Sequence, residues 1–188
     1  MTDCILTYTG IEFSPICAEP HHISPRDIAH ALSLMTRANG HFPTFFSVAQ
    51  HSLNCAKEAA ARSHSERVQL YCLLHDAQEA YISDLTRPVK AHLTKYVVIE
   101  KQLQSVIFKA FGLGKWEEEE ACLTGAVDDA MLYHDFFHFT GHKTFPEEPR
   151  LFSSPDLSER PFSDVEQEFL ELFNALQKET VKTAPLVL

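Results

Sequence analysis

The stretch Val68-Gln-Leu-Tyr-Cys-Leu-Leu-His-Asp-Ala-Gln-Glu-Ala-Tyr-Ile82 decides the fold of this chain. Its Leu- and Ala-rich composition predicts an α-helix over residues 65–82. Residues 70–74 are almost entirely apolar, so this helix is expected to be buried over much of its surface. The polar residues that follow the apolar run therefore need an explanation.

Three of these polar residues, His75, Asp76 and Glu79, are spaced so that they can point into the same space. A buried acid beside a buried histidine needs hydrogen-bond partners or a metal ion. The dipeptide alone is a weak signal, because the chain contains a second one, His134-Asp135. That pair has His138 where the first has Glu79, and we assign His134-Asp135 no direct role.

Helical periodicity and capping signals predict further helices on both sides of this segment. They cover residues 24 to about 39, 47–62, 93–111 and 117–139, and a last helix opens at the capping box Ser163-Asp-Val-Glu166. Residues 3–14 surround Thr9-Gly10 with β-branched and aromatic residues, which predicts a short hairpin. The proline-rich residues 140–161 cannot form one regular element, and such a long loop is often functional or loosely ordered.

The expected fold class is all-α, a bundle of six or seven helices with a short N-terminal β-hairpin-like appendage. A chain of 188 residues with 45% hydrophobic residues can build one substantial core, so we expect a single domain over 1–188. Its parts are the appendage at 1–22, a helical core with the metal site at 23–139, the loop at 140–161 and a C-terminal helix at 162–180.

The composition also limits where the chain works and what it binds. Its five cysteines are odd in number and contain no Cys-x-x-Cys, which is typical of reduced thiols in a cytosolic protein. The chain has no long apolar run, and Met1-Thr2-Asp3-Cys4 has no basic region, so we expect a cytoplasmic protein that neither is secreted nor spans a membrane. A net charge of -10 argues against binding long nucleic acid and favours small ligands.

Two more residues can join the polar group from other helices. His51 lies on the apolar stripe of residues 47–62 and faces inward, either as a ligand or as a core histidine satisfied by a hydrogen bond. Asp128 lies on the apolar stripe of residues 117–139, where an acid is costly unless it meets a cation. Together with His75 and Asp76 they would form a mixed nitrogen and oxygen site, suited to Mn, Fe, Co, Ni or Zn with positions open for water and substrate. Thiolate ligands are absent from this set, which argues against a structural zinc.

The chain resembles the HD-domain phosphohydrolases, in particular the small bacterial and prophage branch near the 5′-deoxynucleotidases and deoxynucleotide triphosphohydrolases. The resemblance spans roughly residues 5 to 135, and it implies the helical HD-domain fold. It rests on these motifs: Asp27-Ile-Ala-His-Ala-Leu-Ser33, Arg37-Ala-Asn-Gly-His41, Phe46-Ser-Val-Ala-Gln-His51, Leu74-His-Asp-Ala-Gln-Glu-Ala-Tyr81, Asp84-Leu-Thr-Arg-Pro-Val-Lys90 and Val127-Asp-Asp-Ala-Met-Leu132.

The resemblance implies one divalent metal ion, with Mn, Co, Fe, Ni, Zn and Mg as candidates. Its implied ligands are His51, His75, Asp76 and Asp128, with Asp128 preferred over Asp129 because it follows the small residue Val127 and lies on the helical stripe.

The resemblance also implies roles around the metal. Glu79 and Asp84 match two catalytic acids, and Arg37 matches an arginine placed against the substrate phosphate. Lys90 is a candidate second phosphate contact, with a solvated surface lysine as the alternative. The chain departs from its relatives at Asp135-Phe-Phe-His138, where they typically continue with a Glu and basic residues, so a polar network there is expected to differ.

The implied function is a metal-dependent phosphohydrolase acting on small nucleotides, first of all a 5′-deoxynucleotidase that releases phosphate from deoxynucleoside monophosphates. The alternatives are a dNTP triphosphohydrolase or stepwise nucleotide phosphatase, a more distant guanosine-alarmone hydrolase, and a noncatalytic HD module that binds metal or nucleotide. Glu79 and Asp84 favour an enzyme, because a purely structural site would not need acids in addition to the metal ligands. A homodimer is expected by analogy. The base is expected to contact residues 41–46 and the long loop.

Overall fold

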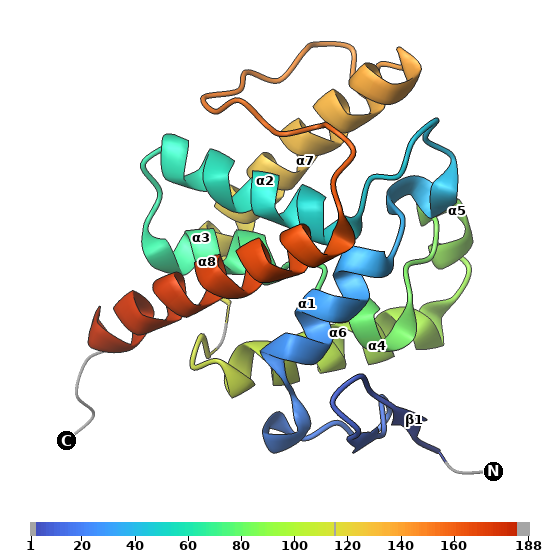
Figure 1. Ribbon diagram of the computed structural model, residues 1–188, viewed down its shortest axis with the longest axis vertical. Helices are drawn as coiled ribbons and strands as arrows, with labels where there is room; N and C mark the ends of the chain where they lie inside the picture. Colours follow the sequence, from blue (N-terminus) through green and yellow to red (C-terminus); the bar gives the residue numbers. More distant parts are fainter. Residues whose placement is uncertain (1–2, 115, 184–188) are drawn as a thin grey trace.

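Helices α2 (Val48–Ala61) and α3 (Glu66–Leu74) form the centre of a helical bundle in this computed structural model, which describes residues 3–114 and 116–183. The long helix α7 (Glu118–Thr140) packs against both of them. Helix α8 (Phe162–Thr183) packs along α3 and α1 (Pro25–Leu34), and it crosses the front of the molecule in Figure 1.

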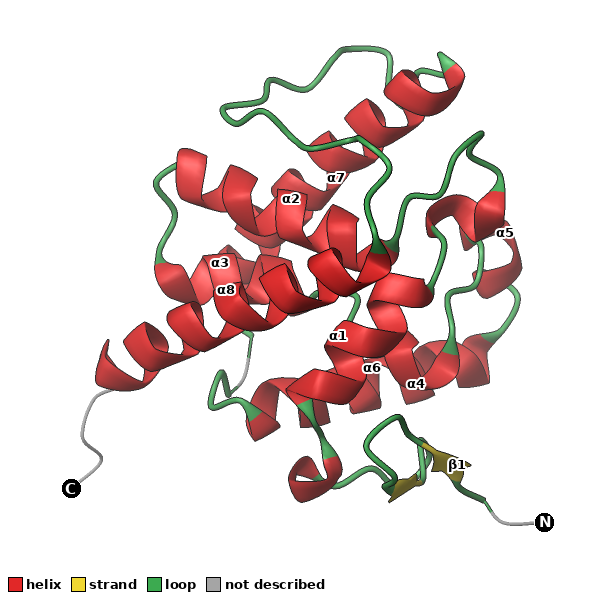
Figure 2. Ribbon diagram, viewed as in Figure 1, coloured by secondary structure: helices red, strands yellow, loops and turns green. Residues whose placement is uncertain are grey.

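Helices account for nearly all the regular structure in the described residues, as Figure 2 shows. Six of them have nine residues or more, the sixth being α6 (Thr94–Ala110). The shorter elements are the helices α4 (Glu79–Ile82) and α5 (Arg87–Lys90) and the 3₁₀ turns η1 (Pro20–His22) and η2 (Arg37–Gly40). The predicted all-α bundle is therefore confirmed. No helix in the described part of the chain is long and apolar enough to span a membrane.

The core is built from the apolar stripes that helical periodicity predicts. Residues 70–74 of α3 are fully buried, and Tyr71 packs against Phe108 of α6 with ring centroids 4.8 Å apart. Helix α8 contributes Phe169 and Phe173, both buried, and the Phe173 ring meets Phe111 at 4.7 Å. This burial supplies the main driving force for folding and fixes the helices that carry the polar site.

The predicted N-terminal hairpin is present as strands β1 (Ile5–Leu6) and β2 (Glu12–Phe13), which pair antiparallel. It is tied to the bundle, because the carboxylate of Asp27 on α1 accepts hydrogen bonds from the backbone and hydroxyl of Thr9 at 2.7 and 2.9 Å. Met1 and Thr2 of the expected appendage lie outside the described residues, as do residues 184–188 of the expected domain.

The predicted continuous helix over residues 65–82 is wrong, because the chain breaks between α3 and α4. The ring of His75 donates a hydrogen bond to the carbonyl of Cys72 at 2.7 Å, and the side-chain amide of Gln104 donates one to the carbonyl of Leu74 at 2.8 Å. The backbone between the helices tightens to 3₁₀-type bonds, such as Glu79 N to Asp76 O at 3.0 Å. Side chains three residues apart lie above one another in this geometry, which brings Asp76 and Glu79 to the same side.

Two other predicted helix ends also shift. The first helix ends at Leu34, well before Asn39, because Met35 and Thr36 take extended ψ angles of 126° and 132° and Thr36 pairs with Ser47. Ala38 and Asn39 then take left-handed φ angles of 52° and 51°, which a right-handed helix cannot continue. The last helix begins at Phe162, so Ser163 lies inside it, and the carbonyl of Pro161 accepts the first backbone bonds. The predicted capping box at Ser163 is therefore not the helix start.

The proline-rich loop over residues 140–161 is fixed by three buried polar side chains of α2, Gln50, Asn54 and Glu58, which we call the polar ladder. Gln50 and Asn54 donate to the carbonyl of Asp156 at 3.2 and 2.9 Å. Glu58 accepts from the backbone N–H groups of 152 and 153 at 3.1 and 2.8 Å. Residues four apart on a helix share one face, so a single face of α2 holds the loop.

Candidate metal centre and cavity

His51, in the first turn of α2, is fully buried, and its two ring nitrogens have different partners. Nδ1 lies 2.7 Å from the Asp135 carboxylate on α7 and donates its proton there. Nε2 lies 3.1 Å from Oδ1 of Asp128 and 3.4 Å from Sγ of Cys55. A carboxylate oxygen this close to Nε2 is favourable when a positive charge lies there, as a proton on Nε2 or as a metal ion between the two atoms.

His75 repeats this arrangement from the break after α3. Its Nδ1 must carry a proton, because its partner at 2.7 Å is the carbonyl of Cys72, which can only accept. Its Nε2 is buried and lies 3.2 Å from Asp76 and 3.5 Å from Asp128. Burial alone would lower the pKa of His75, but the Asp76 and Asp128 carboxylates raise this pKa well above its usual range. The position therefore calls for positive charge.

Four donor atoms converge at this point, one each from His51, Cys55, His75 and Asp128, which we call the donor cluster. All of them lie within 4.8 Å of one another. Ligands of a tetrahedral ion with bonds of about 2.0 to 2.3 Å are separated by about 3.3 to 3.8 Å, and three donor-atom pairs of the cluster lie near this range, at 3.1, 3.4 and 3.5 Å. Both imidazoles donate their other N–H to a carboxylate or carbonyl, as metal-bound histidines do. The donor cluster could therefore hold one metal ion.

Arg37 lies beside the donor cluster and is surrounded by carboxylates. Its guanidinium contacts Asp76 at 3.4 Å, Asp135 at 3.7 Å and Asp128 at 3.8 Å. Burial would lower the pKa of Arg37, but these carboxylates raise it above its usual range, so the guanidinium stays charged. Asp76 is half-buried; desolvation would raise its pKa, but His75 and Arg37 lower this pKa to about 2. Three of the four predicted ligands belong to the donor cluster, and Asp76 lies next to it, held by Arg37.

Two members of the site were missed by sequence reasoning. The expectation that sulfur is absent is wrong, because Cys55 lies one helical turn after His51 on the same face of α2. Burial and the Asp128 carboxylate raise the pKa of the Cys55 thiol well above its usual range.

The second missed residue is Asp135, which was expected to have no direct role. It is fully buried and orients His51. Its neighbour His134 instead donates to the carbonyl of Pro149 at 2.8 Å and takes no part in the donor cluster. The signal for Asp135 was its helical phase, since it follows Asp128 by seven residues, two turns along the same side of α7.

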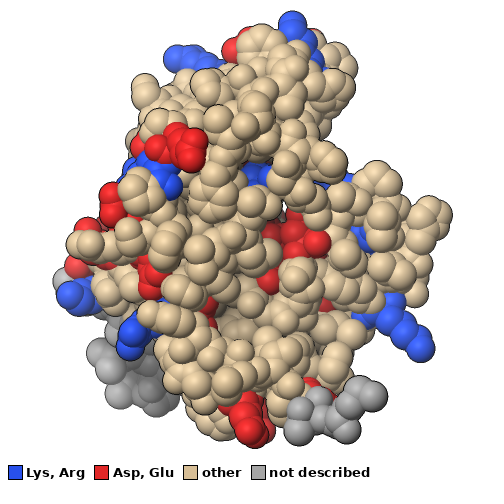
Figure 3. Space-filling model, turned by 45° about the vertical axis from the view of Figure 1, so that its right-hand side comes forward, with Lys and Arg blue, Asp and Glu red and all other residues tan. Residues whose placement is uncertain are grey.

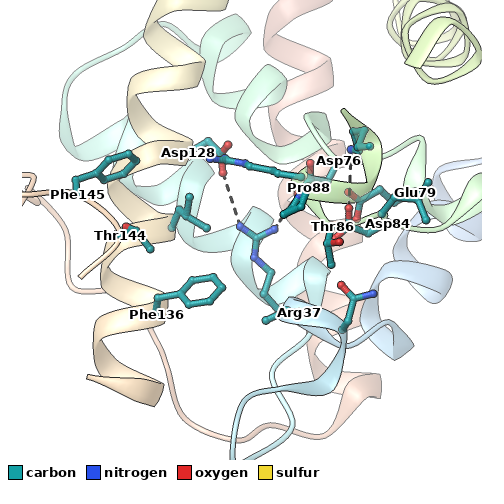
Figure 4. Close-up of a pocket in the computed structure, with 16 residues that line it drawn as sticks. Arg37, Asp76, Glu79, Asp84, Thr86, Pro88, Asp128, Phe136, Thr144 and Phe145 are labelled. Carbon is teal, nitrogen blue, oxygen red and sulfur yellow. Dashed lines mark hydrogen bonds and ion pairs between the residues drawn. The ribbon is translucent and has the colours of Figure 1, made fainter. Parts of the chain in front are cut away.

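A cavity of about 490 Å³ opens beside the donor cluster (Figure 4). On the side of the molecule that carries α5, Figure 3 shows acidic side chains exposed in a recess with basic side chains nearby. Six of the eight predicted site residues line the cavity, His51 and His75 being the exceptions. The lining residues of the predicted set are Arg37, Asp76, Glu79, Asp84, Lys90 and Asp128.

Glu79 and Asp84 form a second acidic pair within this cavity. Burial and the nearby Asp76 raise the pKa of Glu79 to about 10, so its carboxyl group holds a proton at neutral pH. Burial also raises the pKa of Asp84, although Lys90 opposes this shift. The Nζ of Lys90 lies 2.6 Å from Glu100 and 3.9 Å from Asp84, so this lysine is paired with acids at the cavity wall.

The expected base-contacting segment, residues 41–46, does not line the cavity. Phe42 and Phe46 turn into the protein and pack against Phe139 of α7, with ring centroids 4.6 and 5.1 Å apart. The long loop does reach the cavity, through Thr144 and Phe145.

Comparison with known proteins gives relatives without a described activity. No protein-family model matches the chain. The uncharacterized protein YfdR of Escherichia coli is 35% identical over 109 residues, which cover 58% of each chain. An uncharacterized protein of Rhodobacter capsulatus is 40% identical over 100 residues, which cover 50% of each. The matches thus span about half of this chain and about half the length of the relatives, and the site has to be interpreted from its own geometry.

Proposed function

We propose that this protein is a metal-dependent phosphohydrolase of the HD type that acts on small nucleotides, first of all on deoxynucleoside monophosphates. The observation that carries the proposal is the position of Arg37, whose half-buried, permanently charged guanidinium faces the cavity beside a donor cluster that could hold a metal ion. A guanidinium beside a cation site is suited to bind the oxygens of a phosphate group.

The donor set supports a divalent transition metal. Two imidazole nitrogens and a sulfur favour Zn, Co or Fe over Mg, which prefers oxygen ligands. A metal ion held by His51, Cys55, His75 and Asp128, with Asp76 adjacent, would supply Lewis-acid stabilisation of the charge on a phosphoryl group.

Arg37 would bind and orient the phosphate. Its contacts with Asp76 and Asp128 run through the terminal nitrogens and are 3.4 and 3.8 Å long, longer than a tight charged hydrogen bond. Phosphate oxygens could therefore compete for the same N–H groups without displacing a strong pair. The ring of carboxylates keeps the guanidinium in place when no substrate is bound.

Glu79 and Asp84 would handle protons on the other side of the cavity. In hydrolysis a water oxygen bonds to phosphorus, the bond from phosphorus to the ester oxygen breaks, and the leaving oxygen takes up a proton. The raised pKa of Glu79, about 10, favours it as the donor of that proton. Asp84, which is more exposed than Glu79 and lies 3.9 Å from the ammonium group of Lys90, would accept the proton from water.

A phosphate-release screen tests the proposal. Deoxynucleoside monophosphates, deoxynucleoside triphosphates and ribonucleotides are incubated with the protein in Zn, Co, Mn or Mg. Release of inorganic phosphate from monophosphates is expected, and Glu79→Gln should reduce kcat at least 100-fold because a positioned proton donor contributes about that much or more. Asp129→Asn serves as the matched control, because Asp129 is exposed, and it should keep the wild-type kcat.

Other outcomes of the screen overturn the proposal in distinct ways. Tripolyphosphate released from triphosphates, with monophosphates untouched, would identify a triphosphohydrolase. No release from any nucleotide with any metal would make the protein a noncatalytic metal- or nucleotide-binding module.

A further inference from the structure

The cavity has two chemically different ends. Figure 4 shows Glu79 and Asp84 on one side, Phe136 and Phe145 on the opposite side, and Arg37 between them. The phosphohydrolase chemistry proposed above uses only the acidic side and the centre. The aromatic side has no part in that chemistry, although it contributes much of the wall.

One face of α7 connects the two ends. Asp128, Leu132 and Phe136 all line the cavity and are four residues apart, so they follow one another along the helix. Eight residues of α-helix rise about 12 Å, which separates the donor cluster from the aromatic end by more than the length of a phosphate group. A ligand that fills the cavity must therefore be elongated, with its charge at one end.

The aromatic end also carries an unsatisfied polar atom. The hydroxyl of Thr144 is buried at the cavity wall and has no hydrogen-bond partner among the described residues. A buried hydroxyl without a partner is costly, so a ligand that supplies one is favoured. Two aromatic rings with one hydrogen-bonding hydroxyl between them fit a planar ring that has polar edges.

The loop that carries Thr144 and Phe145 is held at both ends. Gly141 closes α7 in a left-handed conformation, with its N–H bonded to Phe137 O at 2.9 Å. At the far end, the Pro149 carbonyl accepts from His134 at 2.8 Å. The few residues between these points are therefore positioned before a ligand arrives, which lowers the entropic cost of binding.

We propose that Phe136, Thr144 and Phe145 form a nucleobase subsite, in which the base stacks on the phenylalanine rings and its polar edge bonds to the Thr144 hydroxyl. The substrate is then a nucleoside phosphate, and phosphorylated sugars or amino acids without an aromatic ring are poor substrates. This subsite rests on the proposed function for the position of the phosphate.

The test compares a purine deoxynucleoside monophosphate with 2-deoxyribose 5-phosphate, which keeps the phosphate ester and lacks the base. Wild-type kcat/KM should be at least tenfold higher for the nucleotide. Phe136→Ala and Phe145→Ala should each lower the nucleotide value by about 10- to 100-fold, as expected for loss of one base-stacking contact, and leave the base-free value unchanged. Phe137→Ala is the matched control, since Phe137 is exposed and does not line the cavity.

Three results overturn the subsite. Equal wild-type values for the two substrates would mean that the base is not recognised. If Phe136→Ala and Phe145→Ala lowered kcat/KM equally for both substrates, the two phenylalanines would have a structural role only. If Thr144→Val and Phe136→Ala both kept the wild-type ratio of kcat/KM between the nucleotide and the base-free substrate, these residues would not recognise the base.

A binding measurement separates this inference from the proposed function. Calorimetric titration with the same nucleotide is carried out on wild type, Phe145→Ala and Phe137→Ala. Binding without hydrolysis that Phe145→Ala weakens would support the subsite and overturn the phosphohydrolase. Absence of binding as well as hydrolysis would overturn both.

Discussion

Asp135 is a fully buried carboxylate that serves two partners at once, His51 and Arg37. Its short bond to His51 fixes the ring so that the other nitrogen points into the donor cluster. Its contact with Arg37 at 3.7 Å helps to keep the guanidinium beside the same point. One residue therefore orients both a member of the donor cluster and the guanidinium proposed to bind phosphate.

Asp135→Asn should lower the affinity for Zn or Co by about 10- to 100-fold, because an amide is uncharged and holds the imidazole less firmly. Competition with a chromophoric chelator measures this affinity directly. Asp129→Asn, at an exposed position on the same helix, should bind metal like the wild type. Equal affinities in all three proteins would show that the bond to His51 has no influence on the site.

Sequence reasoning predicts residues of this kind unevenly. Helical phase singles out His51 and Asp128, since a polar residue on an apolar stripe has few explanations, and the resemblance to HD-domain phosphohydrolases implies them and His75 as ligands. Cys55 lies on an apolar stripe too, but a buried cysteine is ordinary core material, so its position carried no signal. Asp135 was passed over because His134 beside it suggested the wrong pattern.

Two neighbouring stripes of helix α2 have different roles, one in holding the long loop and one in forming the donor cluster. One stripe of α2, Gln50, Asn54 and Glu58, holds the long loop, and the next stripe carries His51 and Cys55 into the donor cluster. Glu58 is the strongest link, since its carboxylate also accepts from Arg62 at 2.8 Å. Burial would raise the pKa of Glu58, but the bonds from Ser153 and Arg62 lower it below its usual value.

Glu58→Gln should destabilise the protein by about 2 kcal/mol at pH 7, because it weakens charged hydrogen bonds to the loop and removes the ion pair with Arg62. The lowered pKa means that this stabilisation is present above the unfolded-state pKa of about 4.3 and is lost as the pH falls through the folded value. Urea unfolding in the presence of a chelator, at pH 7 and again in acid, measures both effects.

The difference between wild type and Glu58→Gln should therefore shrink in acid. Glu147→Gln changes the same residue type in the same loop at an exposed position and should leave stability unchanged at either pH. A difference between wild type and Glu58→Gln that is equally large in acid would mean that packing, and not charge, accounts for it.

Element boundaries were predicted less well than element types. Four predicted helices match α2, α6, α7 and α8 within one to three residues, because apolar periodicity extends over several turns of each, whereas α1 ends about five residues early. The break between α3 and α4 has no such signal, since it depends on His75 and Gln104 competing for backbone carbonyls. Gln104 is distant in sequence, so only the folded chain brings this competitor into place.

At the scale of the whole molecule, the donor cluster links three segments that are far apart in sequence. His51 and Cys55 come from α2, His75 from the end of α3, and Asp128 from α7. The carboxylates of Asp76, Asp128 and Asp135 around the cluster outnumber the single guanidinium of Arg37 that faces them, so negative charge remains there when no metal ion is bound. A metal ion that binds here would therefore stabilise the folded state and bind the unfolded chain much less.

Adding Zn to the metal-free protein at about 100 times its dissociation constant should stabilise the fold by about 2.7 kcal/mol. For a chain of this size the melting temperature should rise by roughly 5 to 10 °C, which differential scanning calorimetry measures. The same scan on Asp128→Ala should show no Zn-dependent rise. A rise of equal size in this variant would place the bound metal elsewhere.

The polar ladder forms hydrogen bonds mainly with main-chain atoms of the loop, the carbonyls of 156 and 158 and the N–H groups of 152 and 153. The side chains of Thr144 and Phe145, which line the cavity, take no part in these hydrogen bonds. Their identities can therefore change without loosening the loop or disturbing the helices. This separation makes the rim the natural place for new ligand preferences to evolve, and a library randomised at these two positions should retain a high fraction of folded members.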